Sequence, residues 1–311
     1  MNPLVSVVVP VFNREKLIKR SLDSVFSQTY RPVELIVVDN SSTDSSLKNI
    51  QAWKQHHDGD SEFIIKILSE SKRGACAARK KGEDCASGEF VIFFDSDDEM
   101  NPDLLKEAIN AFKTEAAPDV VCWPCRIHQL DGTLKVPPFM PENPLEGHLI
   151  HTLFRPQGTM FRNEFLKKTG GWEKDISVWN DFELGLRVLL NNPKITGVKK
   201  ILADIYSQSE SITGKDFSSK EGSWEKTIEI MREDNKDIQH PLMEKIDAIL
   251  DYREVILAAH YSREGNRASA RKLLKDAIKK QNLLRKFCFM SAYYYTRKGG
   301  RGAWRILRYF I

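Results

Sequence analysis

The chain has 311 residues, of which 41% are hydrophobic and 29% charged, a composition typical of a globular protein rather than a disordered or fibrous one. No stretch approaches the roughly 20 consecutive apolar residues that a membrane-spanning helix needs. The N-terminus enters a strand without a basic leader or cleavage site, and the five cysteines suit a reducing compartment better than a disulfide framework. We therefore expect a cytoplasmic protein.

Charge is distributed unevenly along the chain. Residues 271–311 contain twelve Lys or Arg and a single acid, Asp276, and so carry +11. Because the whole chain carries +4, residues 1–270 carry −7. The body of the protein is acidic and its end is basic.

The first 116 residues alternate strands with helices. Unbroken apolar runs predict buried strands at residues 5–12, 33–38, 63–68 and 90–94. Helical spacing of apolar residues, or a run of small residues, predicts helices at 14–28, 43–57, 74–86 and 102–116. This alternation indicates right-handed βαβ units, and hence an α/β fold with a Rossmann-like, mostly parallel sheet flanked by helices.

The pattern is less regular between residues 119 and 219. We expect a hairpin of strands 119–128 and 132–136, helices at 145–154, 163–168 and 179–190, and strands at 157–161 and 195–206. His148 and His151 are three residues apart, but nothing else marks a metal site there, so we expect them at the surface.

From Trp224 onward the pattern is helical. The segments 246–259 and 268–278 form a predicted helical pair that turns at Glu264-Gly265-Asn266. We therefore expect two domains, residues 1–215 and a C-terminal α-helical module at residues 220–311.

Three carboxylates follow the strand at 90–94, in Asp95-Ser96-Asp97-Asp98. Crowded carboxylates repel one another unless something positive lies between them, and a divalent cation is a suitable partner. Ligands of open α/β sheets bind beyond the carboxyl ends of the strands, so the turn fits a metal-assisted phosphate site. A solvated acidic turn that caps the helix near Pro102 is the alternative.

Two nucleotide-binding folds are excluded by the sequence. No Gly-x-Gly-x-x-Gly follows the first strand, and no Gly-Lys-Ser/Thr loop occurs. The sheet is therefore predicted to be neither a dinucleotide-binding fold nor a P-loop fold.

Four segments in order, residues 7–13, 34–44, 74–88 and 95–98, resemble the glycosyltransferase family 2 enzymes of the GT-A fold. The resemblance covers roughly residues 4–210. It implies that Pro10, Phe12 and Asn13 border the nucleotide and that Asp39 accepts a hydrogen bond from its base, typically uracil. Asp39 also fits a helix cap.

The resemblance assigns further residues to the phosphates and the metal. Arg79 matches a basic residue near the nucleotide and phosphates, although a solvated helix Arg would look the same. Asp95, Ser96 and Asp97 match the family's Asp-x-Asp element. This implies that Asp97 binds Mg²⁺ or Mn²⁺ directly and that Asp95 lies nearer the ribose or a metal-bound water.

Asp181 matches the aspartate of the family's acidic pair at the start of a helix, which implies the catalytic base. An acid favoured there by the helix dipole is the alternative. The chain departs from the family pattern at Asn180, where the usual residue is Glu. It also departs at residues 206–209, where Tyr-Ser-Gln-Ser stands in place of a frequent His.

The resemblance implies an inverting transferase that moves a sugar from a nucleotide diphosphate, typically a UDP-sugar, to a hydroxyl of a saccharide or lipid-linked glycan, in cell-surface polysaccharide or glycan synthesis. Mn²⁺ or Mg²⁺ would stabilise the departing diphosphate. A non-catalytic nucleotide-sugar-binding scaffold is one alternative. A nucleotidyltransferase is another, but residues 10–14 lack the Gly-rich basic loop that it would need.

The C-terminal segment interleaves aromatic and basic residues, at 285–290, 293–295 and 304–311. Such a composition favours a segment that lies on an anionic membrane surface, here the inner face of the cell membrane. Nucleic acid is a less favoured partner for the patch. A helix packed on the first domain with a solvated basic face is the other alternative.

Overall fold

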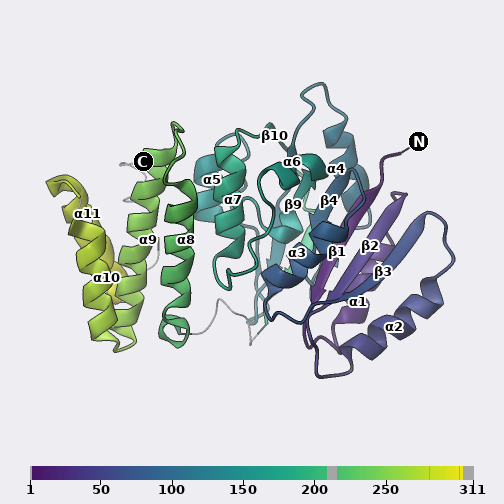
Figure 1. Cartoon of the computed structure of the whole chain (residues 1–311), viewed down its shortest axis with the longest axis horizontal. Coiled ribbons are helices and arrows are strands. Elements are labelled where there is room, and N and C mark those ends of the chain that lie inside the picture. The colour runs from purple at the N-terminus through teal and green to yellow at the C-terminus, as the bar shows by residue number, and fades with distance from the viewer. Residues whose placement is uncertain (1, 209–215, 280, 301, 304–311) are drawn as a thin grey trace. The chain divides into compact units, whose positions relative to one another are not determined.

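The computed structural model describes residues 2–208, 216–279, 281–300 and 302–303. The chain forms two compact units, Met1–Ser209 and Glu210–Ile311 (Figure 1). The predicted domain limits at residues 215 and 220 stay a prediction. Within the described residues, no helix combines the length and the apolar character that crossing a membrane requires.

The first unit is built on a mostly parallel sheet, as predicted. Among the described residues its strand order is β10-β6-β9-β4-β1-β2-β3. The parallel pairs join β1 (Val5–Val11), β2 (Val33–Asp39), β3 (Phe63–Ser69) and β4 (Phe90–Phe93), and likewise β6 (Val120–Cys122) and β10 (Ile195–Gly197). One strand, β9 (Thr159–Arg162), runs antiparallel between β4 and β6.

The register of the sheet brings the loops that follow three strands to one edge. Val11 pairs with Asp39, and Val8 pairs with Phe93, so the loops that follow β1, β2 and β4 leave the sheet side by side. Because β9 runs in the opposite direction, it brings its beginning to this edge, just after the 3-10 turn η1 (Pro156–Gly158).

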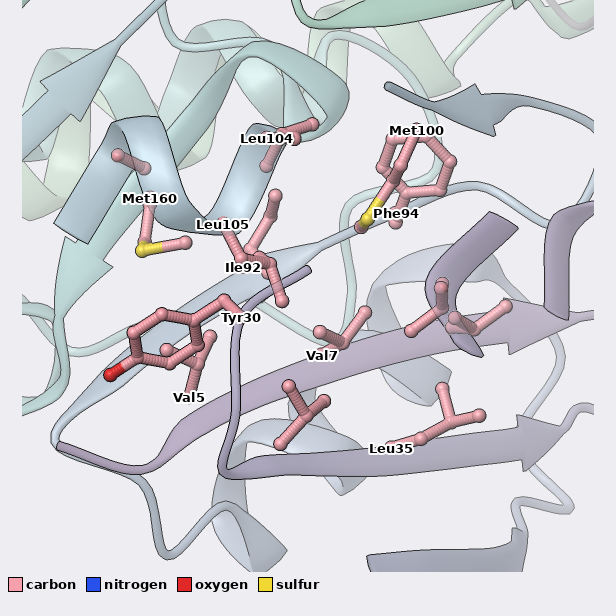
Figure 2. Close-up of a cluster of buried hydrophobic side chains, with 14 of the residues drawn as sticks. Val5, Val7, Tyr30, Leu35, Ile92, Phe94, Met100, Leu104, Leu105 and Met160 are labelled. Carbon is pink, nitrogen blue, oxygen red and sulfur yellow. The ribbon is translucent and has the colours of Figure 1, made fainter. Parts of the chain in front are cut away.

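Successive side chains of β1 point to opposite faces of the sheet and meet different helices. Val5 and Val7 belong to the core that includes Leu104 and Leu105 of α4 (Figure 2). The core on this face is completed by α1 (Ile18–Phe26), α2 (Ser46–His57) and α4 (Leu104–Phe112).

On the other face, α3 (Ala75–Cys85) lies close against β1 and β2. A Cβ atom at Gly82 would lie 2.3 Å from Cγ1 of Val8, so the helix reaches this depth only because residue 82 is glycine. The helix is thereby fixed beside the carboxyl edge.

A second, smaller sheet has the order β5-β11-β7-β8. The predicted strand 119–128 is divided at Trp123-Pro124, because its first part, β6, pairs in the large sheet and its second part, β7, pairs in the small one. The predicted hairpin is confirmed as the antiparallel pair β7–β8. The small sheet consists of β5 (Glu99–Met100), β7 (Cys125–His128), β8 (Leu134–Lys135) and β11 (Ala203–Tyr206).

The remaining elements of the first unit are α5 (Pro144–His151), α6 (Asn163–Lys168) and α7 (Asn180–Leu190). The described part of the second unit is helical, as predicted. The expected pair is formed by α9 and α10, which turn at Gly265, where φ is +94°. This unit contains η2 (Phe217–Lys220), α8 (Ser223–Asn235), α9 (Met243–Arg263), α10 (Arg267–Lys279) and α11 (Leu283–Arg297).

Candidate active site

The acidic turn begins where β4 ends. Phe94 donates its N–H to the carbonyl oxygen of Val8 (2.9 Å), and Asp98 donates its N–H to the carbonyl oxygen of Asp95 (3.3 Å). The side chains of Ser96 and Asp98 are buried, whereas those of Asp95 and Asp97 are partly exposed. The turn is therefore fixed to the sheet and presents two of its three carboxylates to solvent.

Two donors hold the Asp95 carboxylate. Arg79 Nη2 lies 2.7 Å from Oδ1, and Gln157 Nε2 lies 2.7 Å from Oδ2. The Arg79 side chain is only 5% exposed, and its guanidinium lies 4.6 Å from the centre of the Trp172 ring. Burial opposes its charge, but the Asp95 carboxylate raises the pKa of Arg79 overall. Arg79 Nε and Nη1 have no partner among the described residues, so two buried donors remain for a ligand.

The same glutamine amide also reaches Asp98. Gln157 Nε2 donates to Asp98 Oδ2 (2.7 Å), and the N–H of Tyr206 donates to Asp98 Oδ1 (2.8 Å). Burial, followed by the charges of Asp95 and Asp97, nevertheless raises the pKa of Asp98 well above its ordinary value. Burial and the charge of Asp95 also raise the pKa of Asp97. Both carboxyl groups therefore hold a proton more readily than a free aspartate does.

Two arginines near α1 contact Asp97. Arg14 Nε lies 3.4 Å from Oδ2 of Asp97, and Arg20 donates to the Asp97 carbonyl oxygen. Arg20 also lies over the Tyr206 ring, with its Cζ 3.8 Å from the centroid. The acidic turn is therefore bordered by basic side chains that come from an early part of the chain.

The loops after β1 and β2 are hydrogen-bonded to each other. Asn13 adopts a left-handed conformation with φ of +52°, and its Oδ1 accepts the N–H of Thr43 (2.8 Å). Its own N–H donates to Ser42 Oγ (3.1 Å). The two loops thus form one wall beside the sheet edge.

The other predicted nucleotide contacts lie on this wall. Pro10 lies in β1 opposite Val38, and Phe12 is partly exposed with Arg73 Cζ 4.0 Å from its ring centroid. Asp39 is buried and accepts the N–H of Ser42 at 3.3 and 3.4 Å. Since α2 begins at Ser46, Asp39 closes a local turn and does not cap that helix.

Asp181 lies in the first turn of α7, where its Oδ1 accepts the N–H of Phe182 (2.9 Å). The side chain of the preceding Asn180 donates to Cys76 of α3, and the charge of Asp181 acts on Arg79. The start of α7 therefore lies against the start of α3. Asp181 is half-buried and lies close enough to Arg79 for its charge to favour the guanidinium.

The expectation that His148 lies at the surface is wrong. His148 is fully buried, its Nε2 lies 3.0 Å from the carbonyl oxygen of Phe182, and its ring stacks on the Phe182 ring. The histidine therefore helps to position the first turn of α7, next to Asp181.

The family model described as "Glycosyl transferase family 2" matches residues 6–170, which is more than half of the chain. The chain belongs to this family. A cholesterol galactosyltransferase from Borreliella burgdorferi is 31% identical over 175 residues, which are 55% of this chain and 47% of that protein. The matches span less than half the length of the curated relatives.

Two solved structures share the fold. One is Staphylococcus aureus TarS 1–349 in complex with UDP-GlcNAc, with a TM-score of 0.70 and 21% identity over 94% of this chain and 87% of that chain. The other is a mannosyltransferase, PcManGT from Pyrobaculum calidifontis, in complex with GDP-Man and Mn²⁺, with a TM-score of 0.60 and 18% identity over 96% of this chain and 84% of that one. The predicted GT-A fold is confirmed at the level of architecture.

The residues that match the family pattern lie at the acidic turn and on the wall beside it. Asp95, Ser96 and Asp97 lie together with Arg79 and near Asp181, while Pro10, Phe12, Asn13 and Asp39 lie on the adjoining wall. At the place of the frequent family histidine, Ser207 donates its N–H to the carbonyl oxygen of His128 (2.9 Å). His128 itself stacks on Tyr206, and its Nε2 lies 2.6 Å from Asp204 Oδ1.

The donor set at the turn fits a divalent ion that is shared with a ligand. Among the described residues, no group of three or more His, Cys, Asp or Glu side chains is arranged to hold a metal alone. Mg²⁺ commonly takes only one or two carboxylates and completes its shell with water and substrate phosphates. Asp97 and Asp95 could supply such carboxylates, and a cation there would offset the burial and the charge of Asp95 that raise the pKa of Asp97.

Sequence analysis missed Gln157, Arg14 and Trp172. Gln157 precedes the strand β9, whose antiparallel direction is not visible in the residues, so nothing placed it beside Asp95. Arg14 could have been suspected because it follows Asn13 directly. The contact of Trp172 with Arg79 depends on the packing of α3, which the sequence does not reveal.

Proposed function

We propose that the chain is a metal-dependent, inverting glycosyltransferase that transfers a sugar from a nucleotide diphosphate, preferentially a UDP-sugar, to an acceptor hydroxyl. One observation carries the proposal. The Asp95 carboxylate lies 2.7 Å from the buried Arg79, which keeps two donors without partners, and Asp97 follows two residues later in the same turn. An anionic ligand with a cation would satisfy both the spare donors and the spare carboxylate charge.

In this proposal Asp97 binds Mn²⁺ or Mg²⁺ directly, and Asp95 lies nearer the ribose or a metal-bound water. The bound cation stabilises, as a Lewis acid, the charge that develops on the departing diphosphate. Arg79 Nε and Nη1 donate to phosphate oxygens. The Mn²⁺ in the mannosyltransferase complex supports a divalent ion for this fold.

The nucleotide lies against the wall formed by the loops after β1 and β2. Pro10, Phe12 and Asn13 border it, Asp39 accepts from the base, and Ser96 completes the contacts at the turn. Arg73 holds one side of the Phe12 ring, so the opposite side and the ring edge are available to the ligand.

Asp181 acts as the general base. It takes the proton of the acceptor hydroxyl while the hydroxyl attacks the anomeric carbon on the side opposite the diphosphate, which inverts the configuration. No covalent enzyme intermediate is required. The contact of His148 with the carbonyl of Phe182 holds the helix turn from which Asp181 projects.

The acceptor is a saccharide or lipid-linked glycan, in the synthesis of cell-surface polysaccharide or glycan, and the chain works in the cytoplasm at the inner face of the cell membrane. The 31% identical relative, a cholesterol galactosyltransferase, supports an acceptor hydroxyl that belongs to a membrane lipid. Nucleic acid is not a partner in this proposal.

A non-catalytic nucleotide-sugar-binding scaffold is the second candidate. Asn180 favours this candidate, because it stands where the family's acidic pair usually has glutamate. Its side chain is hydrogen-bonded to Cys76. A screen of nucleotide sugars for release of the nucleoside diphosphate, with and without Mn²⁺, separates the two. Nucleotide binding with no donor ever turned over would establish the scaffold.

Asp97→Asn tests the metal assignment. We expect loss of Mn²⁺-dependent UDP binding, because the change removes the charged oxygen that binds the ion, and calorimetric titration of UDP with and without Mn²⁺ measures it. Asp58→Asn, in an exposed loop, is the matched control and should bind as the unchanged protein does. Unaltered Mn²⁺ dependence in Asp97→Asn would refute the assignment.

Asp181→Asn tests the base. UDP affinity should persist while transfer falls by about 10²–10⁴-fold, the usual range for loss of general base catalysis. Glu164→Gln, an exposed acid in the first turn of α6, controls for a helix-dipole effect and should keep full transfer. Turnover retained by Asp181→Asn would remove this residue as the base.

A further inference from the structure

The outer face of α11 is apolar and exposed to solvent. Leu283, Phe287 and Leu284 are 86%, 71% and 60% exposed, and about half of Tyr294 and Tyr295 is exposed. The helix already buries a different face within the helical unit, where it packs on α9 and α10 at the edge away from α8 (Figure 1). The residues on that inner face are Phe289, Ala292, Tyr293 and Thr296.

Helical spacing shows that the exposed residues form one continuous stripe. Residues 283, 287, 294 and 298 are separated by four, seven and four positions, which places them along one side of an α-helix. This side is opposite to Ala292 and Phe289, which face inward. The exposure is therefore a property of the whole helix face and not of single hydrophobic residues, which are common on protein surfaces.

The charge around the stripe identifies its occupant. The sequences of α10 and α11 contain eight Lys or Arg and a single acid, Asp276, and α11 contains no acid. Arg297 and Lys298 are exposed at the C-terminal end of the stripe, next to Tyr294. Long basic side chains beside an apolar face can reach lipid headgroups while the apolar side chains enter the acyl boundary.

We propose that the outer face of α11 docks on an anionic bilayer, with Leu283, Leu284 and Phe287 inserted and the basic residues at the headgroups. The helix has 15 residues and lies along the surface, since it is too short to span the roughly 30 Å hydrocarbon core. This inference rests on the proposed membrane location. It is tested without donor or acceptor, so its failure is separate from failure of sugar transfer.

The test is co-sedimentation of the full chain with vesicles of phosphatidylcholine, alone or mixed with phosphatidylglycerol. We expect binding to the mixed vesicles that weakens with salt, and little binding to phosphatidylcholine alone. Phe287→Ser should weaken binding to the mixed vesicles about tenfold or more, because a large apolar side chain no longer enters the bilayer. Leu130→Ser, at a site 70% exposed in the β7–β8 turn, should leave binding unchanged.

A charge variant tests whether the basic residues contribute to vesicle binding. Lys298→Glu should reduce binding to the mixed vesicles, while Lys113→Glu, at an exposed site after α4, should not. Equal affinity of Phe287→Ser and the unchanged chain would overturn the proposal. So would a dimer in light scattering that Phe287→Ser converts to a monomer, since a second copy would then cover the face. Salt-sensitive RNA binding that is lost in Lys298→Glu, without vesicle binding, would assign the patch to nucleic acid instead.

Discussion

Gln157 is the residue on which two carboxylates of the acidic turn depend. Its Nε2 donates to both Asp95 and Asp98, and it is itself buried. Gln157→Leu removes these donations from the buried Asp98 and the partly exposed Asp95, so we expect the free energy of unfolding to fall by roughly 2 kcal/mol at neutral pH. Urea denaturation measures the change, with the exposed Gln55→Leu as control. An unchanged midpoint would mean that water replaces the amide fully.

The acidic turn could be predicted from the sequence, whereas the Gln157 amide that binds it could not. Asp95 and Asp97 follow an apolar strand directly, so the sheet edge could be inferred from the order of residues alone. Gln157 lies about sixty positions later, and its contact depends on β9 entering the sheet in the antiparallel direction. The function of His148 was missed for a similar reason, since only the packing of α5 on α7 buries it.

At the scale of elements, the bend before α7 is fixed by a glutamate of α3. A Cβ atom at Gly171 would lie 1.8 Å from Glu83 Oε1, and Glu83 Oε2 accepts the N–H of Trp172 (2.9 Å). Gly170 also has a positive φ, but a Cβ atom there would lie 3.2 Å from Arg187 Nη1. A substitution at Gly170 therefore tests mainly backbone strain, whereas a substitution at Gly171 adds a steric clash with Glu83.

We expect Gly170→Ala to cost about 1 kcal/mol of unfolding free energy, from backbone strain alone. Gly171→Ala should cost more than about 3 kcal/mol, because the buried Glu83 side chain has no room to move away. Denaturant titration of both variants gives the comparison. Equal losses would show that Glu83 relaxes and that its contact with the bend has little weight.

Most strands could be predicted from unbroken apolar runs, and most helices from apolar residues at helical spacing. The exceptions are physical. Residues 119–128 form one apolar stretch in the sequence, yet Trp123-Pro124 transfers the chain from one sheet to another. Proline lacks the N–H that a continuous strand would donate, but whether the chain then changes sheets depends on partners far away in sequence.

At the scale of the whole molecule, the helical unit contains a titratable group with its own pH dependence. Glu254 lies 3.3 Å from Arg232. Burial, and the nearby Asp251 and Asp276, raise its pKa to about 7 although Arg232 acts in the opposite direction. The folded protein therefore holds the proton more tightly than the unfolded chain, whose glutamate pKa is near 4.5.

The stabilisation by protonated Glu254 is complete below about pH 4.5 and is lost as the pH rises through 7. Glu254→Gln should match the unchanged protein near pH 4 and be the more stable of the two at pH 8, by roughly 3 kcal/mol at most. Thermal melts of the full chain and the variant across this range measure the difference. A difference that stays constant with pH would contradict the raised pKa.

The direction of β9 has a consequence for how such proteins diversify. The chain enters β9 beside the acidic turn and leaves it at the far end of the sheet, through α6. The stretch from β8 to Gln157 therefore ends at the acidic turn, while the ladder between β4 and β9 leads away from it. If the proposed function is right, chimaeras that exchange residues 136–155 between relatives should change the surface that adjoins the acidic turn and leave the loops after β1 and β2 unchanged.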